Sequence, residues 1–362
     1  MSLRVLSVRS LRIPFKQSFA HASAVRSVTE SVLVRVVDGE GREGVGEGCP
    51  RRYVTGETVE SIQQFIEAYR GEWVEFSGLD DLTRWVVDHA AIVDRNPAGW
   101  CAVEIACLDL FGRRAAMPIE RLIGVPTLRG PFRYSAVLGT ETMAAFDKQF
   151  AQYLAAGFLD FKVKVTGRVQ EDIDKLSKLA ALPNCRVRLD ANNHWIRAED
   201  AIASLRQLPR PISAIEEPLS VGDLEGCRQV AEALGVRIVL DESLLRADQC
   251  DALARDPARW MVNIRVSKMG GLVRSLAVAE RAKQRGIPIV VGAQVGETSI
   301  LTRAALPVAQ AYRDVVMAQE GAFGTHLLEH DICQPTVMFG NGGVLLPDAL
   351  STRPGLGLTV WD

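Results

Sequence analysis

The sequence has no long apolar run and no excess of charge of either sign. No apolar stretch approaches the ~20 residues that span a bilayer, so we expect no contact with a membrane. The 42 lysines and arginines are balanced by 44 aspartates and glutamates, which gives a formal net charge of −2. Because no overall positive field exists, we also expect no nucleic-acid partner.

Cysteine is present but lacks any paired spacing. The seven cysteines are odd in number, scattered, and form no C-x-x-C motif. This pattern favours reduced thiols and argues against a metal site built from cysteine. Arg4, Arg9, Arg12 and Lys16 interrupt the first residues, so no signal peptide is expected. We therefore expect a cytoplasmic protein.

The first part of the chain has a mixed α+β texture. The whole chain has 362 residues, more than the ~250–300 at which one hydrophobic core usually stops growing. Near-alternating patterns predict strands, and helical spacing follows them. The strands are expected at 5–13, 30–37 and 44–48, loops at 15–28 and 49–58, and helical segments at 61–66 and 102–111. We assign residues 1–128 to an α+β capping domain.

From residue 129 a repeat of short apolar runs and helix-like stretches begins. Eight runs start 23 to 28 residues apart, which predicts a (β/α)8-type, TIM-like barrel over residues 129–330. The expected strands are 132–138, 158–165, 186–192, 212–219, 237–242, 260–266, 287–293 and 315–319. A doubly wound open sheet is the alternative. Residues 331–362 are expected to return to the capping domain.

Charged side chains recur where these strands end. Their positions are separated by steps of 25 to 27 residues: Lys164, Asp190, Glu216, Asp241 and Lys268. Carboxyl ends of barrel strands meet at one mouth, where barrel enzymes keep their chemistry. Strand alternation places Lys162 on the same face as Lys164. The sequence therefore predicts one charged cluster.

Asp190, Glu216 and Asp241 form a set of oxygen ligands on three adjacent strands. Three carboxylates so close would repel one another unless a cation neutralised them. Oxygen ligands without cysteine or histidine select a hard ion, so we expect Mg²⁺, with Mn²⁺ as an alternative. We expect Arg265 to pair with an acid and Glu320 to be a possible cation contact.

The lysines point to proton transfer. Neighbouring ammonium groups depress each other's pKa, and a lysine near neutrality can act as a general base. A metal beside a substrate carboxylate stabilises the charge that develops when the adjacent carbon loses its proton. We therefore expect a small-molecule carboxylate substrate.

At this point the sequence resembles the enolase superfamily, and within it the muconate-lactonizing subgroup. The resemblance rests on Lys-x-Lys at 162–164, Asp-Ala-Asn at 190–192, Glu-Glu-Pro at 216–218, Asp-Glu-Ser at 241–243 and Lys-x-Gly-Gly at 268–271. It implies that Asp190, Glu216 and Asp241 bind Mg²⁺ and that Lys164 and Lys268 are the acid/base pair. It also implies electrostatic support from Lys162, and a homo-oligomer.

The substrate contacts are less defined. In this family the two capping loops look over the barrel mouth, which implies Phe19 and Tyr53; the strand ends add Asn192, Glu297 and Phe323. Dipeptide epimerases of the family carry an Asp-x-Asp pair on strand eight. Here that stretch is Gly-Ala-Phe at 321–323.

The sequence therefore favours a muconate-lactonizing-like cycloisomerase that passes through an enediolate. The alternatives are an N-acyl amino acid or dipeptide racemase or epimerase, and a hydroxy-acid dehydratase. A protein of a different class, a non-catalytic metal-binding barrel, is the remaining alternative. Deuterium uptake from D₂O distinguishes the catalytic candidates from that last one.

Overall fold

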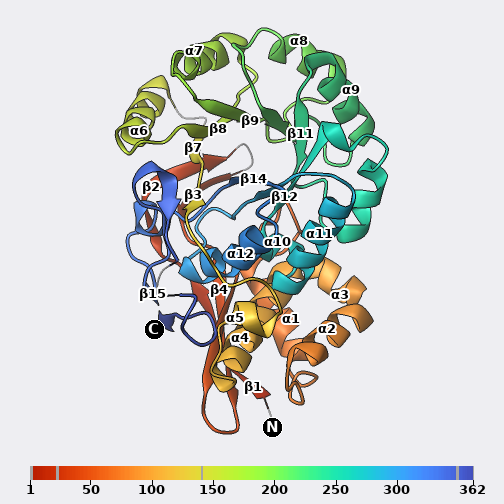
Figure 1. Cartoon of the computed structure of the whole chain (residues 1–362), viewed down its shortest axis with the longest axis vertical. Helices are drawn as coiled ribbons and strands as arrows, with labels where there is room; N and C mark the ends of the chain where they lie inside the picture. Colours follow the sequence, from red (N-terminus) through yellow and green to blue (C-terminus); the bar gives the residue numbers. More distant parts are fainter. Residues whose placement is uncertain (1–2, 22–23, 140–141, 348–349, 362) are drawn as a thin grey trace.

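A computed structural model describes residues 3–21, 24–139, 142–347 and 350–361. The N-terminal part is a three-stranded antiparallel sheet in the order β1 (Leu3–Leu11), β4 (Ser31–Asp38) and β5 (Glu43–Gly48) (Figure 1). The helices that follow pack beside it. They are α1 (Val59–Tyr69), α2 (Leu79–Asp88), α3 (Ala90–Arg95), α4 (Pro97–Arg114) and α5 (Ile119–Leu122).

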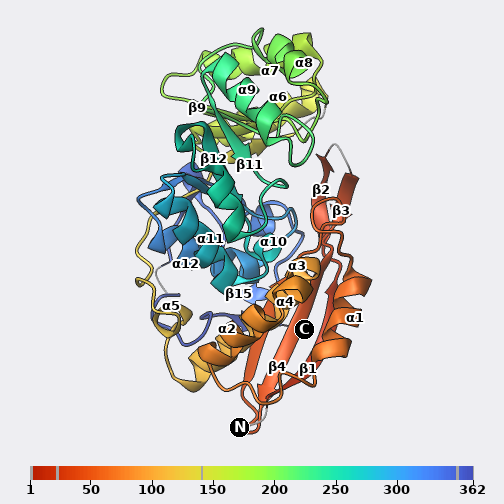
Figure 2. The same ribbon diagram turned by 90° about the vertical axis from the view of Figure 1, so that its right-hand side faces the viewer.

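The segment expected as a loop over 15–28 is a β-hairpin, so that expectation was wrong. Strand β2 (Pro14–His21) pairs antiparallel with β3 (Ala24–Val28). Pairing of Phe19 with Arg26, of Ala20 with Val25 and of His21 with Ala24 joins the two strands. Figure 2 shows the hairpin extending from the end of the three-stranded sheet towards the barrel. The segment 49–58 is irregular, as expected.

Close packing joins strand β5 to helix α4. At Gly44, Gly46 and Gly48 an added Cβ would overlap carbonyl oxygens of the helix backbone. These three residues alternate along the strand, so all of them face the helix. Glycine is needed here because the two backbones approach too closely for any side chain.

The second part is an eight-stranded parallel sheet whose order follows the sequence. Its strands are β7 (Ala136–Leu138), β8 (Asp160–Lys164), β9 (Arg186–Asp190), β10 (Ala214–Glu216), β11 (Arg237–Leu240), β12 (Trp260–Ile264), β13 (Ile289–Val291) and β14 (Val316–Gln319). The first and last strands meet where the Ser135 amide donates to the Gln319 carbonyl at 2.8 Å. The (β/α)8-type fold is confirmed.

The first barrel strand is shorter than expected. Residues 132–138 were expected as one strand, but β6 (Phe132–Arg133) pairs antiparallel with β16 (Val344–Leu345) near the C-terminus. Tyr134 also donates its amide to the Gly343 carbonyl at 2.8 Å. The chain therefore pairs first with the C-terminal segment and joins the barrel only at β7.

Helices surround the barrel strands, as the arc of α7, α8 and α9 in Figure 1 shows. They are α6 (Met143–Ala155), α7 (Val169–Ala180), α8 (Ala198–Leu205), α9 (Leu224–Leu234), α10 (Val266–Met269), α11 (Leu272–Gln284) and α12 (Ser299–Ala311). Between β11 and β12 the connection is 3₁₀-helical, η1 (Ala247–Leu253) and η2 (Pro257–Arg259). After β14 follow η3 (Gly324–His326), β15 (Cys333–Gln334), η4 (Asn341–Gly343) and β17 (Thr359–Val360).

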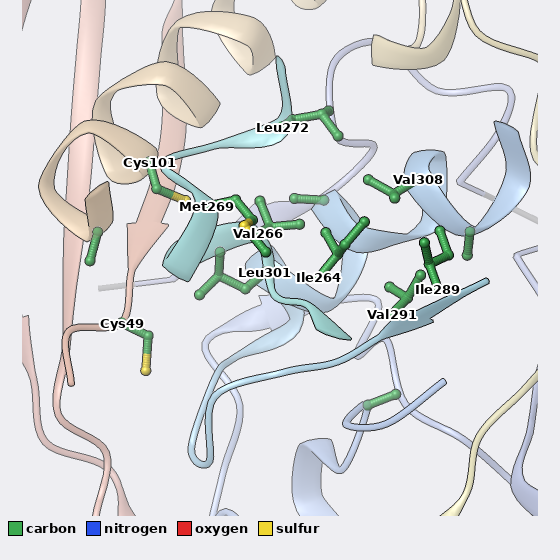
Figure 3. Packing of buried hydrophobic residues seen from close by; sticks show 14 of the residues in the cluster. Cys49, Cys101, Ile264, Val266, Met269, Leu272, Ile289, Val291, Leu301 and Val308 are labelled. Atoms are coloured by element: carbon green, nitrogen blue, oxygen red, sulfur yellow. The ribbon is translucent and has the colours of Figure 1, made fainter. Parts of the chain in front are cut away.

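One hydrophobic core connects the N-terminal part with the barrel. The buried cluster runs from Leu3 to Leu358. Figure 3 shows Cys101 of α4 beside Met269 of α10, with Leu301 of α12 close to them. All seven cysteines are free. Among the described residues, no helix combines the length and apolar character that crossing a membrane requires.

Buried carboxylates reinforce this junction. Glu47 accepts hydrogen bonds from the Thr298 amide and hydroxyl. Glu104 accepts from the Leu272 and Val273 amides at the start of α11, at 2.5 and 3.1 Å. Each places an acid of the N-terminal part at the first turn of a barrel helix, whose orphan N–H groups it satisfies.

Candidate active site

The charged residues at the strand ends do converge. Lys164 pairs in register with Asp190, and Asp190 with Glu216. Asp241 directly follows β11. With Lys162, these residues line a cavity of about 60 Å³ at the carboxyl ends of the barrel strands. Parallel pairing thus brings together side chains that lie far apart in sequence.

Lys162 links the acids from within the barrel. Its Nζ lies 2.7 Å from Glu216 Oε1, 3.2 Å from Asp190 Oδ2 and 3.1 Å from Glu320 Oε2. Burial lowers its pKa, but Asp190, Glu216 and Glu320 outweigh burial and hold the pKa well above the ordinary lysine value. Lys162 therefore stays charged and serves as a fixed counter-ion.

Arg265 supplies a second buried cation. Its guanidinium forms an ion pair with Asp241, lies 3.6 Å from Glu216 Oε1, and donates to the Gln294 amide oxygen at 2.9 Å. Burial raises the pKa of Asp241, but Arg265 and Lys268 together bring it below the ordinary value. Asp241 is therefore an anion held between two cations.

Glu216 has the opposite electrostatic balance. Burial raises the pKa of Glu216 well above the ordinary value. Lys162 lowers this pKa, but the negative charges of the neighbouring acids raise it further; these acids are Asp190, Glu320 and Asp241. At the Glu216 carboxyl, the nearby cations therefore do not fully compensate the negative charge of the surrounding acids. A further cation at this point would relieve that repulsion.

Lys164 is the lysine whose charge is disfavoured. Burial is the largest cause that lowers its pKa; Lys162 and Arg265 add to the effect, while Asp190 opposes it. Its Nζ donates to the Asn192 side-chain oxygen at 3.1 Å and lies 3.8 Å from Asp190 Oδ2. Lys164 therefore has the properties of a general base held in place by a neutral amide.

Lys268 lies outside the cavity lining. Its ammonium is completely buried and donates to Asp241 Oδ1 and to the carbonyl oxygens of Asp241 and Asn263, each at 2.7 Å. The residue belongs to the short helix α10 that begins directly after β12. It contacts the cluster through Asp241 and does not line the cavity that Lys164 lines.

The expected substrate contacts are divided. Tyr53, Asn192 and Phe323 line the cavity. Glu297 does not, because its carboxylate accepts the Gln294 amide hydrogen bond at 2.7 Å and closes the turn after β13. The backbone of Phe19 pairs with Arg26, but its side chain lies outside the described part of the structure.

Two polar residues near the site were missed by sequence reasoning. Gln294 borders the cavity, and Arg188 donates to Glu320 at 3.0 Å below it. Arg188 precedes Asp190 by two positions, so strand alternation would have placed both on the same face. Gln294 carries no charge, and no pattern in the sequence indicated it.

The three carboxylates have the chemistry that a hard divalent ion requires, but in this structure they point towards cationic side chains of the protein. Asp190, Glu216 and Asp241 offer only oxygen, which Mg²⁺ prefers. In the described part of the chain, no three acidic, histidine or cysteine side chains are gathered closely enough to coordinate a metal. Lys162 and Arg265 lie against these carboxylates instead. Rotation of the acids away from the two cations is therefore required for metal binding.

Comparison with known proteins gives one family and several relatives. Residues 145–362 match the family model described as enolase C-terminal domain-like. A hydrophobic dipeptide epimerase of Enterococcus faecalis is 27% identical over 90% of this chain and 92% of its own length. An L-Lys-D/L-Arg epimerase of Methylococcus capsulatus is 28% identical over the full length of both. Muconate cycloisomerase 1 of Rhodococcus opacus is 27% identical, over 98% of this chain and 96% of its own.

Solved structures agree with these relatives. The dipeptide epimerase of Enterococcus faecalis, complexed with Mg and L-Leu-L-Tyr, superposes with a TM-score of 0.86 at 26% identity, covering 99% of this chain and 100% of that chain. A dipeptide epimerase of Methylococcus capsulatus, complexed with Mg and L-Arg-D-Lys, gives the same TM-score and identity and covers 100% of both chains.

Proposed function

This chain belongs to the enolase C-terminal domain-like family, and we propose that it is an epimerase or racemase of dipeptides or N-acyl amino acids. The reaction moves the proton on the carbon next to the substrate carboxylate. The observation that carries the proposal is Lys164, a buried lysine of lowered pKa beside three convergent carboxylates. The sequence motifs favour a cycloisomerase, but the epimerase relatives favour the alternative, an epimerase or racemase.

Asp190, Glu216 and Asp241 are the residues that would hold Mg²⁺. Two relatives with TM-scores of 0.86 were crystallised with Mg, which supports this assignment. When bound, Mg²⁺ supplies positive charge beside the substrate carboxylate and so makes the adjacent C–H more acidic.

Lys164 removes the proton. Its lowered pKa makes the neutral amine accessible, and Asn192 holds Nζ in position through its side-chain oxygen. Lys162 remains a fixed cation near the developing negative charge. Lys268 returns a proton to the opposite face of the carbon. For this step its side chain must turn into the cavity, away from the three oxygen atoms that it now contacts at 2.7 Å.

A cycloisomerase remains the second candidate because of the segment after β14. Gly321, Ala322 and Phe323 present no carboxylate to bind a substrate ammonium group. Glu320 is occupied by Lys162 and Arg188. If the enzyme is an epimerase or racemase, the same segment favours substrates that carry no free ammonium group, such as N-acyl amino acids.

Deuterium exchange tests the function. We expect dipeptides or N-acyl amino acids, incubated with the enzyme and Mg²⁺ in D₂O, to gain one deuterium at the carbon beside the carboxylate and to become a mixture of both configurations at that carbon. Chelation of the metal and Lys164→Ala should each abolish the exchange, while Lys283→Ala, at an exposed ion pair, should not. Failure of every such substrate to exchange, or exchange by Lys164→Ala at the full rate, contradicts the proposal. A lactone or alkene product supports the cycloisomerase or dehydratase instead.

The setting of the enzyme is part of the proposal. The seven free cysteines support a reducing compartment, and we place the protein in the cytoplasm. A homo-oligomer remains our expectation, and light scattering of the purified protein tests it.

A further inference from the structure

A second, larger cavity lies on the flank of the barrel beside the catalytic one. It has a volume of about 350 Å³, against about 60 Å³ for the catalytic cavity. Its walls come from α6, from the turn between α6 and β8, and from the segments after β14. Tyr153, Phe158 and Phe339 form an aromatic row, with ring centroids 5.1 and 5.3 Å apart. We call this space the flank cleft.

Phe323 borders both spaces. It lines the catalytic cavity and the flank cleft, and its ring meets that of Phe339 edge-on at 5.6 Å. The preceding Ala322 has a φ of 53°, a left-handed conformation that costs a residue with a side chain about 1–2 kcal/mol. Such strain is found at active sites, ligand clamps and switch segments. Phe323 thus forms the partition between the two spaces and follows directly on a strained residue.

The flank cleft also holds an unused polar atom. The side-chain oxygen of Gln149 is buried and has no hydrogen-bond partner among the residues that the structure describes. Buried acceptors are normally satisfied, so this one suits a ligand that brings a donor.

Size supports a connection between the two spaces. A buried water needs about 10–15 Å³, so the catalytic cavity alone has room for only about five waters. Small-molecule sites usually measure about 300–1,000 Å³. The catalytic cavity therefore fits the reacting carboxylate and its carbon but little more. With the flank cleft, the space reaches the usual range.

We propose that the flank cleft is the subsite for an aromatic or large apolar group on the acylated side of the substrate. This inference rests on the proposed function and adds the substrate class to it. The carboxylate end lies among the cations of the catalytic cavity, Phe323 turns aside, and the remote group packs against the aromatic row. The substrates are thus N-aryl-acyl amino acids or dipeptides whose first residue is aromatic or large and apolar.

A matched pair of variants at the C-terminal end of α6 tests the subsite. Ala156 lines the flank cleft, whereas the adjacent Ala155 is exposed and does not. Ala156→Phe should fill the cleft, and Ala155→Phe is the control for added bulk and helix stability. The substrates are N-phenylacetyl-L-alanine and N-acetyl-L-alanine, compared by KM in the deuterium-exchange assay.

We expect wild type and Ala155→Phe to have a KM for the phenylacetyl compound about tenfold or more below that for the acetyl compound, since a buried ring contributes at least a factor of ten to affinity. In Ala156→Phe this preference should disappear while the KM for the acetyl compound is unchanged. Equal KM values in wild type, or a preference that survives in Ala156→Phe, overturns the inference. Thermal melting of both variants confirms that each is folded.

Binding without turnover separates this inference from the proposed function. Calorimetry with N-phenylacetyl-L-alanine on Lys164→Ala should show binding that the Lys164→Ala, Ala156→Phe double variant loses. If neither compound exchanges deuterium in wild type but this binding pattern holds, the proposed reaction fails and the subsite stands. If exchange occurs but the double variant binds as well as the single one, the reaction stands and the subsite is wrong.

Discussion

Lys164 links the electrostatics of single residues to the pH dependence of the reaction. A lysine must lose its proton before it can act as a base, so activity rises with pH through its pKa. Burial, Lys162 and Arg265 lower that pKa from the ordinary 10.5. The site therefore reaches full activity at a lower pH than an exposed lysine would allow.

We expect kcat/KM of the wild type to rise with pH along a limb that lies below the ordinary lysine pKa. Lys162→Met removes one positive neighbour, so the pKa of Lys164 rises and the limb moves to higher pH, with lower activity throughout. The pH profile of deuterium exchange measures both effects. Lys283→Met is the control, because its partner Asp314 is on the surface. A limb that stays in place or moves to lower pH in Lys162→Met contradicts this assignment.

Most of the cluster was predictable at the residue scale because strand geometry is regular. Lys162, Lys164, Asp190 and Glu216 lie on barrel strands, where alternation and parallel register determine which way a side chain points. Lys268 lies on a helical turn, so the strand spacing predicts its level along the barrel axis but not the direction in which its side chain points. The cavity lining of the capping part depends on loop conformation, which no periodicity describes.

At the scale of elements, Glu104 connects α4 to the start of α11. The side chain is fully buried, and it accepts the Leu272 and Val273 amides and the Trp100 indole N–H. Burial raises the pKa of Glu104 from 4.5 to about 7. The folded protein therefore keeps a proton between these values that the unfolded chain has already released.

The sign of the resulting pH dependence follows from proton binding. Because the folded state binds more protons, stability falls as pH rises from about 4.5 to about 7 and stays lower above that range. Glu104→Gln removes this component, so we expect its free energy of unfolding to decline less than that of wild type between about pH 5 and pH 8. Urea unfolding across this range measures the difference.

Glu104→Ala should instead lower stability at every pH, by about 1–3 kcal/mol, because buried donors lose their acceptor. Glu280→Gln on the exposed side of α11 is the control and should match the wild type. A pH dependence in Glu104→Gln equal to that of the wild type would show that Glu104 is already ionised in the folded protein near pH 5.

The elements themselves were predicted unevenly, for physical reasons. Helix α9 (Leu224–Leu234) can be recognised from local pattern, since its apolar face and the Gly235 that ends it are both visible in the sequence. The hairpin of β2 and β3 was missed because its polar composition resembles a loop. The pairing of β6 with β16 was missed because it joins residues about 210 positions apart, and local pattern carries no information on such contacts.

At the scale of the molecule, the continuous core predicts joint unfolding of the N-terminal sheet and the barrel. The buried cluster contains Val34 of β4 and Val262 of β12 alike, and Glu47 and Glu104 bond across the junction. A shared core makes separate unfolding of either part expose apolar surface on the other.

We expect peptides from β4–β5 and from β12–β13 to lose protection against hydrogen exchange at the same urea concentration, as measured by mass spectrometry. Peptides from α2, which lies at the outer edge of the N-terminal part in Figure 1, serve as an internal reference for local opening. Loss of protection in β4–β5 at clearly lower urea would show that the two parts unfold independently.

The alternating glycines of β5 also have a consequence for engineering by recombination. The backbones of β5 and α4 are in direct contact at the three glycines. A recombination boundary between residues 48 and 97 would therefore combine β5 of one enzyme with α4 of another, whose surface need not fit it. Chimaeras that exchange parts of the capping domain with homologous enzymes should therefore take residues 43–114 from a single parent.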